Sequence, residues 1–195
     1  VLVSISEPSK YDKRIHRFRK GWNSLIPTHN KIQFAGNMGM FSFGTGWDYG
    51  RRDQWETDLF LGFIPKHDSH RTKLTMTLKQ NYMPWRLVLG KCFSTEPLSC
   101  GLYFNTVFGH EFWVKEPSRY PEGYYGFSSK IRTHIFLGQR LTYNIDKDRR
   151  FFTKSVTLFY ELSTCDLLLI SRATNRYLRA RDYLSLSFGL KFQWL

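Results

Sequence analysis

Apolar and polar residues alternate along most of the chain after residue 30. The clearest case is the C-terminal run 182–195, in which every second side chain is apolar: Leu184, Leu186, Phe188, Leu190, Phe192 and Trp194. Neighbouring side chains of a strand point to opposite faces, so this run predicts a strand with one apolar face and one small or polar face.

The same alternation recurs upstream. It predicts eight strands, at 31–49, 55–63, 71–85, 86–93, 99–110, 129–144, 155–163 and 182–195. In the first of them the apolar parity changes after Met40, and the glycines around this point predict a bulge or close packing. Eight alternating strands joined by turns favour an all-β, antiparallel up-and-down barrel.

The first 30 residues follow a different period. Tyr11, Ile15, Phe18 and Trp22 recur at helical spacing, with basic residues between them. This predicts a short basic amphipathic helix in an N-terminal segment 1–30, ahead of a barrel formed by 31–195. Such a helix lies at a membrane surface, caps the barrel, or packs as an ordinary surface helix.

Two features decide between a soluble and a transmembrane barrel. With the connection after strand 55–63 centred on His67 and Asp68, Glu56 is directly opposite Lys79, so the polar faces are charge-matched. A soluble lipocalin-like barrel instead lines its interior with apolar side chains. The matched charges and the terminal aromatic residues therefore favour a barrel that crosses the bacterial outer membrane.

Connection lengths agree with this interpretation. The long or aromatic connections are expected at one rim, at 111–128 and 173–181, and the short ones at the other, at 65–70, 94–99 and 145–149. Outer-membrane barrels show the same asymmetry between long external loops and short periplasmic turns.

Composition narrows the classes of function. The mean hydropathy of −0.42 excludes a helical membrane protein, because no window approaches the roughly 20 apolar residues that a spanning helix needs. The net charge of +13 is concentrated near the N-terminus and at strand ends. This placement favours anionic lipid head groups, including those of lipopolysaccharide, over nucleic acid. Nothing predicts a cofactor, and no spacing predicts a metal site; a disulfide between Cys92 and Cys100 stays open.

Several stretches resemble an outer-membrane β-barrel family of the Bacteroidota. They are QFAGNMGMFSFGTGWDYG, WETDLFLGFIP, TLKQNYMPW, GLYFNTVFG, RYPEGYYGFSSKIR, FLGQRLTY, FYELSTCDL and LSLSFGLKFQW. The resemblance extends from about residue 9 to the end of the chain. It implies an integral outer-membrane barrel and carries no established activity.

The chain is more distantly similar to the PagL-type lipid A deacylases, which are eight-stranded outer-membrane barrels. Their His-x-Ser-Asn motif and later carboxylate correspond here to Glu161, Ser163 and Asn175, so only the serine is kept. The family's catalytic triad is therefore not present as written.

One other catalytic set is geometrically possible. If the turn before strand 155–163 is centred on Lys147 and Asp148, His134 pairs directly with Glu161, and Ser163 lies one diagonal away. The three would act as base, orienting group and nucleophile. The competing interpretation is a lumen charge network, in which Lys191 also takes part and whose other members are Glu56, Asp58, Lys79, Arg132 and Arg140.

The leading functional hypothesis is an outer-membrane barrel without a pore that serves as an accessory or scaffolding subunit of a larger membrane protein complex. Its expected partners are other outer-membrane proteins, which it would contact through an aromatic interaction loop comprising Trp113, Tyr120, Tyr124, Tyr125 and Phe127. The alternative is a lipid A or phospholipid acyl hydrolase using Ser163, His134 and Glu161. A soluble lipocalin-like binder is a third possibility.

Overall fold

The computed structural model describes residues 10–65, 73–108, 131–166, 168 and 183–194. Within them lie one α-helix, nine strands and one 3₁₀ turn. The helix is α1 (Lys10–Asn23), and the 3₁₀ turn is η1 (Lys147–Arg149). The strands are β1 (His29–Ala35), β2 (Phe41–Tyr49), β3 (Trp55–Ile64), β4 (Lys73–Tyr82), β5 (Leu87–Leu89), β6 (Phe93–Phe108), β7 (Ile131–Asn144), β8 (Ser155–Cys165) and β9 (Ser185–Gln193).

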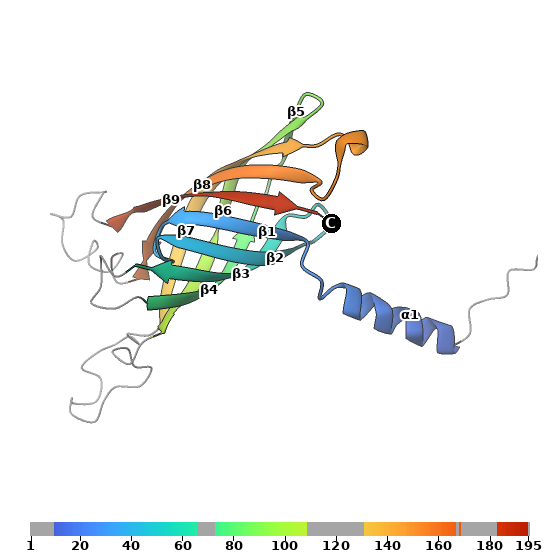
Figure 1. The fold of residues 1–195 in the computed structure, drawn as a ribbon, viewed down its shortest axis with the longest axis horizontal. Helices are drawn as coiled ribbons and strands as arrows, with labels where there is room; N and C mark the ends of the chain where they lie inside the picture. The colour runs from blue at the N-terminus through green and yellow to red at the C-terminus, as the bar shows by residue number, and fades with distance from the viewer. Residues whose placement is uncertain (1–9, 66–72, 109–130, 167, 169–182, 195) are drawn as a thin grey trace, which may run out of the picture.

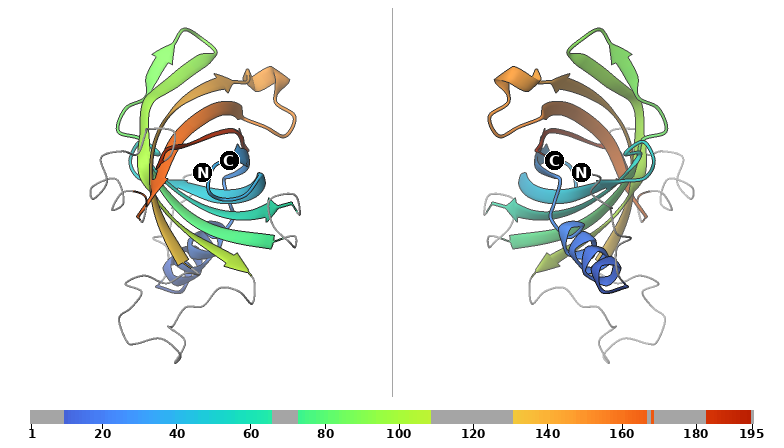
Figure 2. Two further views of the ribbon diagram at one scale, coloured as in Figure 1. Left: turned by 90° about the vertical axis from the view of Figure 1, so that its left-hand side faces the viewer. Right: turned by 90° about the vertical axis from the view of Figure 1, so that its right-hand side faces the viewer.

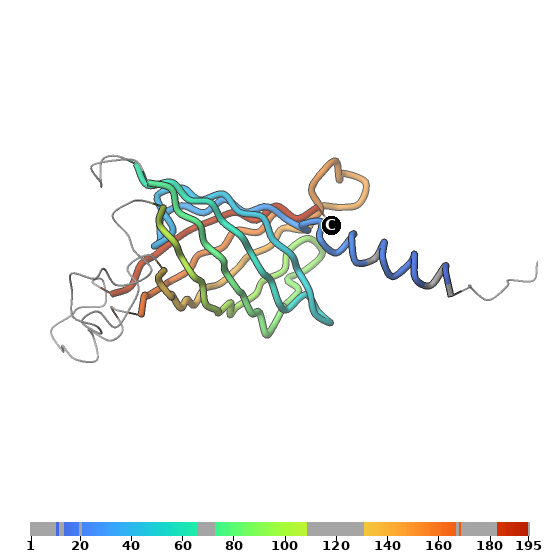
Figure 3. The backbone as a smooth tube through the Cα atoms, turned by 90° about the horizontal axis from the view of Figure 1, so that it is seen from below, coloured from blue at the N-terminus to red at the C-terminus, as the bar shows by residue number. Residues whose placement is uncertain are grey.

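Eight of these strands close into an antiparallel barrel. Neighbouring strands pair in the order β1-β2-β3-β4-β6-β7-β8-β9, and β9 pairs with β1 to complete the ring. The end-on views in Figure 2 show this ring, and the strands run obliquely to its axis in Figure 3. The predicted eight-stranded antiparallel barrel is confirmed.

Two of the predicted barrel strands, 31–49 and 86–93, differ in the structure. The run 31–49 is a hairpin of β1 and β2 rather than one bulged strand, because Gly36 and Gly39 adopt positive φ angles of 80° and 126° in the connection between them. The predicted strand 86–93 contributes only the short β5, which pairs with β6 alone and projects away from the barrel (Figure 1). The barrel gains one strand and loses one, so it keeps eight strands, and β5 is a ninth strand outside the ring.

β6 is longer than predicted. The stretch 94–99, expected as a turn, lies inside this strand, and the register with β7 shifts between Glu96 and Ser99. The shift adds one residue to β6, which forms a bulge at Pro97. Proline has no N–H to donate to the ladder, so a bulge is where a strand tolerates it.

The ends of the strands define two rims. His29 of β1 and Gln193 of β9 pair at one rim, called here the terminal rim, where the connections 50–54, 83–92 and 145–154 also lie. The other rim receives 36–40, 65–72, 109–130 and 166–184. The predicted separation holds for the longest connections. It is wrong for 65–70, which joins the rim of the long connections.

The helix α1 projects away from the terminal rim (Figure 1). Its apolar residues follow helical spacing: Tyr11, Phe18 and Trp22 are exposed, and Ile15 is half-buried. Phe18 and Trp22 pack edge to face. At its end the Ser24 hydroxyl donates to the carbonyl of Gly21. The segment after it is fixed to the barrel, because the indole N–H groups of Trp47 and Trp194 donate to the carbonyls of Leu25 and Pro27.

Candidate functional site

The barrel has an apolar exterior and a polar interior. Most outward-facing residues of the barrel strands are large and apolar, and these are exposed: Phe43 by 61%, Leu137 by 59% and Leu158 by 53%. Inside, most buried side chains of the described residues are charged or polar, with a few aromatic and methionine side chains among them. A soluble barrel has the reverse arrangement, so the apolar-lined interior of a lipocalin-like binder is absent from the described strands.

The interior is filled by ion pairs, which we call the lumen network. Its members are His29, Lys31, Asp48, Glu56, Asp58, Lys79, Arg140, Glu161 and Lys191. They come from β1, β2, β3, β4, β7, β8 and β9, so the network joins nearly the whole circumference of the barrel.

Glu56 is the hub of this network. Arg140 binds it through two nitrogens, Nη1 to Oε2 and Nη2 to Oε1, each at 3.0 Å. The ammonium groups of Lys31 and Lys191 also donate to its two oxygens. Three buried cations thus converge on one carboxylate that has no solvent exposure, and a buried carboxylate requires such compensation.

A second part of the network connects β1, β2 and β3. His29 contacts Asp48 Oδ2 at 3.0 Å through Nδ1 and Asp58 Oδ1 at 2.8 Å through Nε2. The register places Gly46 directly between His29 and Asp58, and a Cβ atom there would collide with both side chains. The missing side chain of Gly46 therefore makes room for this buried contact.

The third part surrounds Lys79. Its ammonium donates to Glu161 and lies 4.3 Å from the centroid of Phe136, with the rings of Phe60 and Phe159 at 5.9 and 5.8 Å. Cation–π attraction adds to the ion pair in such a desolvated position.

Each of these three rings covers a glycine directly opposite it on the neighbouring strand. The pairs are Phe60 with Gly44, Phe136 with Gly101 and Phe159 with Gly189. Eight strands leave an interior only wide enough for side chains, and the glycines provide the space that the rings need.

Three members of the network bring metal-binding donor atoms close together. Donor atoms of His29, Asp48 and Glu56 lie within 4.8 Å of one another. Lys191 donates to both carboxylates, at 2.6 Å to Asp48, and Arg140 and Lys31 bind Glu56 as well. Protein cations already neutralise these carboxylates, so this donor set does not fit a divalent ion.

The predicted lumen residues are placed as follows. Glu56, Asp58, Lys79 and Arg140 are buried in the lumen network, and Lys191 joins it as expected. Arg132 shares the inward face of β7 but lies half-buried toward the opposite rim, eight residues along the strand from Arg140.

The predicted partner of Lys79 is wrong. Lys79 lies opposite Asp58 rather than Glu56, because the register of β3 and β4 is shifted by two residues. Its ion pair is with Glu161, across the lumen.

Sequence reasoning missed three members of the network. His29, Lys31 and Asp48 were not assigned to it, and His29 is fully buried. The alternation along β1 could have identified Lys31. Ile32 and Phe34 point outward, so Lys31 and Gln33 point inward.

The candidate catalytic set does not assemble. His134 is opposite Cys165, and Glu161 is opposite Gly138, so the register expected between His134 and Glu161 is wrong by four residues. Glu161 binds Lys79 instead, His134 stacks on Tyr103 at 4.5 Å and contacts Asn37, and the Ser163 hydroxyl donates to the carbonyl of Ser185. Within the part of the chain that the structure describes, neither His134 nor Glu161 is in the position that the proposed catalytic set requires.

The aromatic interaction loop, with Trp113, Tyr120, Tyr124, Tyr125 and Phe127, lies outside the described residues. So do the His67–Asp68 turn and Asn175. Cys92, Cys100 and Cys165 are all free thiols, which answers the question of a disulfide.

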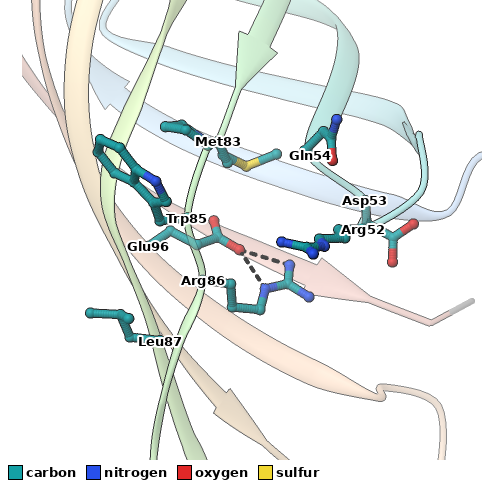
Figure 4. Close-up of a pocket in the computed structure, with 9 residues that line it drawn as sticks. Arg52, Asp53, Gln54, Met83, Trp85, Arg86, Leu87 and Glu96 are labelled. Atoms are coloured by element: carbon teal, nitrogen blue, oxygen red, sulfur yellow. Dashed lines mark hydrogen bonds and ion pairs between the residues drawn. The ribbon is translucent and has the colours of Figure 1, made fainter.

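A pocket of about 210 Å³ opens at the terminal rim, between the connections 50–54 and 83–92. In it the Arg86 guanidinium donates twice to Glu96 Oε1, at 2.9 and 2.7 Å (Figure 4). The other oxygen of Glu96 is 3.9 Å from Arg140 Nε, so this rim pair continues the lumen network to the solvent.

Two further findings concern membrane-spanning helices and similarity to known proteins. Among the described residues, no helix combines the length and the apolar character that spanning a membrane demands. The chain matches no known family model and no curated protein sequence.

Proposed function

We propose that this protein is an integral outer-membrane β-barrel without a pore, which acts as an accessory or scaffolding subunit through its outer wall and rims. The observation that carries the proposal is the polarity of the barrel. Its exterior is a largely apolar wall, and its interior holds a network of ion pairs. Exposed apolar area of this extent is stable in lipid and not in water.

The lumen network argues for a structural role of the interior. Every carboxylate in it is bound by a cation from another strand, and the eight-stranded ring leaves no room for a solute path. With the lumen filled and the candidate catalytic set not assembled among the described residues, we infer that the barrel acts through its outer surface. The described surface that is available for this consists of the apolar wall, the short β5 hairpin, with Val88 exposed by 75%, and the helix α1.

The proposal makes two separable expectations for the full chain in its native membrane. The protein stays in the membrane pellet after alkaline carbonate washing, and it migrates above its monomer mass on native gels after mild detergent extraction. Chemical cross-linking before extraction identifies the neighbours. Release by carbonate contradicts the membrane assignment, whereas a carbonate-resistant protein found only as an uncross-linked monomer contradicts the scaffolding role.

A further inference from the structure

The outer wall has a groove beside the terminal rim, at the junction of β9, β1, β2 and β3. We propose that this groove binds one anionic glycerophospholipid, with an acyl chain along the wall and the phosphate head group at the basic 145–154 connection. This inference rests on the proposed membrane location and goes beyond it by naming a lipid class and its site.

The groove exists because two small polar residues interrupt the apolar wall. Asn30 and Thr45 are directly opposed, with Phe192 beside Asn30 on β9 and Leu59 beside Thr45 on β3. These side chains form one row across four strands, in which the two central members are short. The resulting groove has a volume of about 560 Å³, within the range of about 300–1,000 Å³ typical of small-ligand sites.

Larger apolar side chains form the walls of the groove. Ile32 and Phe43, also directly opposed, lie on the side away from the terminal rim, and Leu61 and Trp194 complete the lining. The depression is therefore elongated and apolar, with a small polar floor. An acyl chain fits a surface of this kind, because each methylene that it buries gains about 0.8 kcal/mol.

The 145–154 connection covers one side of the groove. Phe152 and Thr153 from this segment line the groove together with residues of β1 and β9. Phe151 and Phe152 pack edge to face with centroids 4.5 Å apart, and they are exposed by 88% and 79%. Two adjacent exposed aromatic rings at a rim are typical of the lipid interface.

The same connection is basic and therefore favours a lipid with an anionic head group. It carries four exposed cations, Lys147, Arg149, Arg150 and Lys154, against the two acids Asp146 and Asp148. Arg150 uses Nε to hold the carbonyl of Ile145, which fixes the base of its guanidinium. Juxtamembrane Lys and Arg each contribute about 1 kcal/mol to the attraction of anionic lipid.

The position of the groove specifies the leaflet. Barrels of this class keep their termini and short turns on the periplasmic side, and the groove adjoins the terminal rim. The lipid in question is therefore a phospholipid of the inner leaflet rather than lipopolysaccharide.

Native mass spectrometry of the full chain tests the proposal. The protein is released from detergent micelles that contain equal amounts of phosphatidylglycerol and phosphatidylcholine, and the lipid adducts are counted. We expect one phosphatidylglycerol per chain, bound about fivefold or more in excess of phosphatidylcholine. Equal retention of the two lipids overturns the proposal.

Three single variants and two double variants locate the site. Thr45→Leu fills the floor of the groove and should reduce the phosphatidylglycerol adduct about tenfold. Thr45→Val keeps the shape of threonine and should bind lipid like the wild type. Thr106→Leu changes an outward residue of β6 far from the groove and should also bind like the wild type. Arg149→Gln with Arg150→Gln should abolish the preference for phosphatidylglycerol. Arg51→Gln with Arg52→Gln, on another connection of the same rim, should leave it intact. Binding by Thr45→Leu at the wild-type level, or an equal loss in both arginine pairs, contradicts a groove at this position.

The same preparations separate this inference from the membrane location. Each variant is also reconstituted into phosphatidylcholine vesicles and tested for carbonate resistance. A protein that inserts but shows no lipid preference contradicts the groove alone. One that fails to insert contradicts the proposed function.

Discussion

At the scale of single residues, Glu56 has the largest role in the interior. Its carboxylate binds Arg140, Lys31 and Lys191 at once. The two lysines have second partners in Asp58 and Asp48, each at 2.6 Å. Arg140 has only the more distant Glu96, at 3.9 Å, among the carboxylates of the described residues. Loss of the Glu56 charge therefore leaves mainly Arg140 uncompensated.

We expect Glu56→Gln to lower the free energy of unfolding by about 3–5 kcal/mol, because it leaves a buried cation without its partner. Urea titration of the protein in phosphatidylcholine vesicles, followed by tryptophan fluorescence, measures this loss. The double variant Glu56→Gln with Arg140→Gln should recover part of it, since both charges of the pair are then removed. The control is Arg86→Gln, whose side chain is 49% exposed and whose loss should cost about 1 kcal/mol or less. Equal losses for Glu56→Gln and Arg86→Gln contradict the assigned role.

At the scale of elements, the sequence predicts which face of a strand each residue occupies better than it predicts how neighbouring strands pair. Strict alternation along β3, β8 and β9 assigns inward and outward residues correctly, because the period of two depends only on strand geometry. Pairing between strands depends instead on the length and shape of each connection. The assumed tight turn at Lys147 misplaces β7 against β8 by four residues, since the actual connection runs from 145 to 154.

The two misassigned strands have local causes. Between Met40 and Phe41 the apolar residues switch from even to odd positions, and a bulge or a tight hairpin would produce the same switch. The positive φ angles at Gly36 and Gly39 show that it is a hairpin. The apolar triplet of β5 is indistinguishable in pattern from a barrel strand. His29 escaped detection because it is the first residue of β1, so no preceding alternation marked its face.

The register of β7 and β8 can be tested with a native thiol. In a Cys92→Ser, Cys100→Ser background, His134→Cys places a second thiol directly opposite Cys165. Directly opposed residues have the Cα separation that a disulfide requires, so we expect an intramolecular bond under mild oxidation. Mass spectrometry after digestion identifies the linked peptides. The control adds His134→Cys, Glu161→Cys and Cys165→Ser to the same background. We expect no disulfide between residues 134 and 161, and a disulfide there would support the pairing expected from the sequence instead.

At the scale of the whole molecule, the charges and the fold determine one another. A ring of eight strands has too little interior volume for an apolar core of the usual size, and the inward positions are filled by a charge-balanced network that ties opposite walls together. Lys79 on β4 reaches Glu161 on β8, and Arg140 on β7 reaches Glu56 on β3. These contacts span the lumen, and we propose that they close it to both water and ions.

We therefore expect the wild-type barrel to give no conductance steps in a planar lipid bilayer. Removing Lys79 and Glu161 together, as alanines, keeps the charge balanced and should also leave the barrel silent, because the contacts of Glu56 still obstruct the lumen. Adding Glu56→Ala and Arg140→Ala removes the second obstruction and should produce a small, steady ionic leak. Lys31 and Lys191 keep Asp58 and Asp48 as partners in that variant, which favours its folding, and the mobility of the unheated protein on a gel verifies that it has folded. Conductance by the wild type, or silence of a folded fourfold variant, would show that the lumen network is not what seals the barrel.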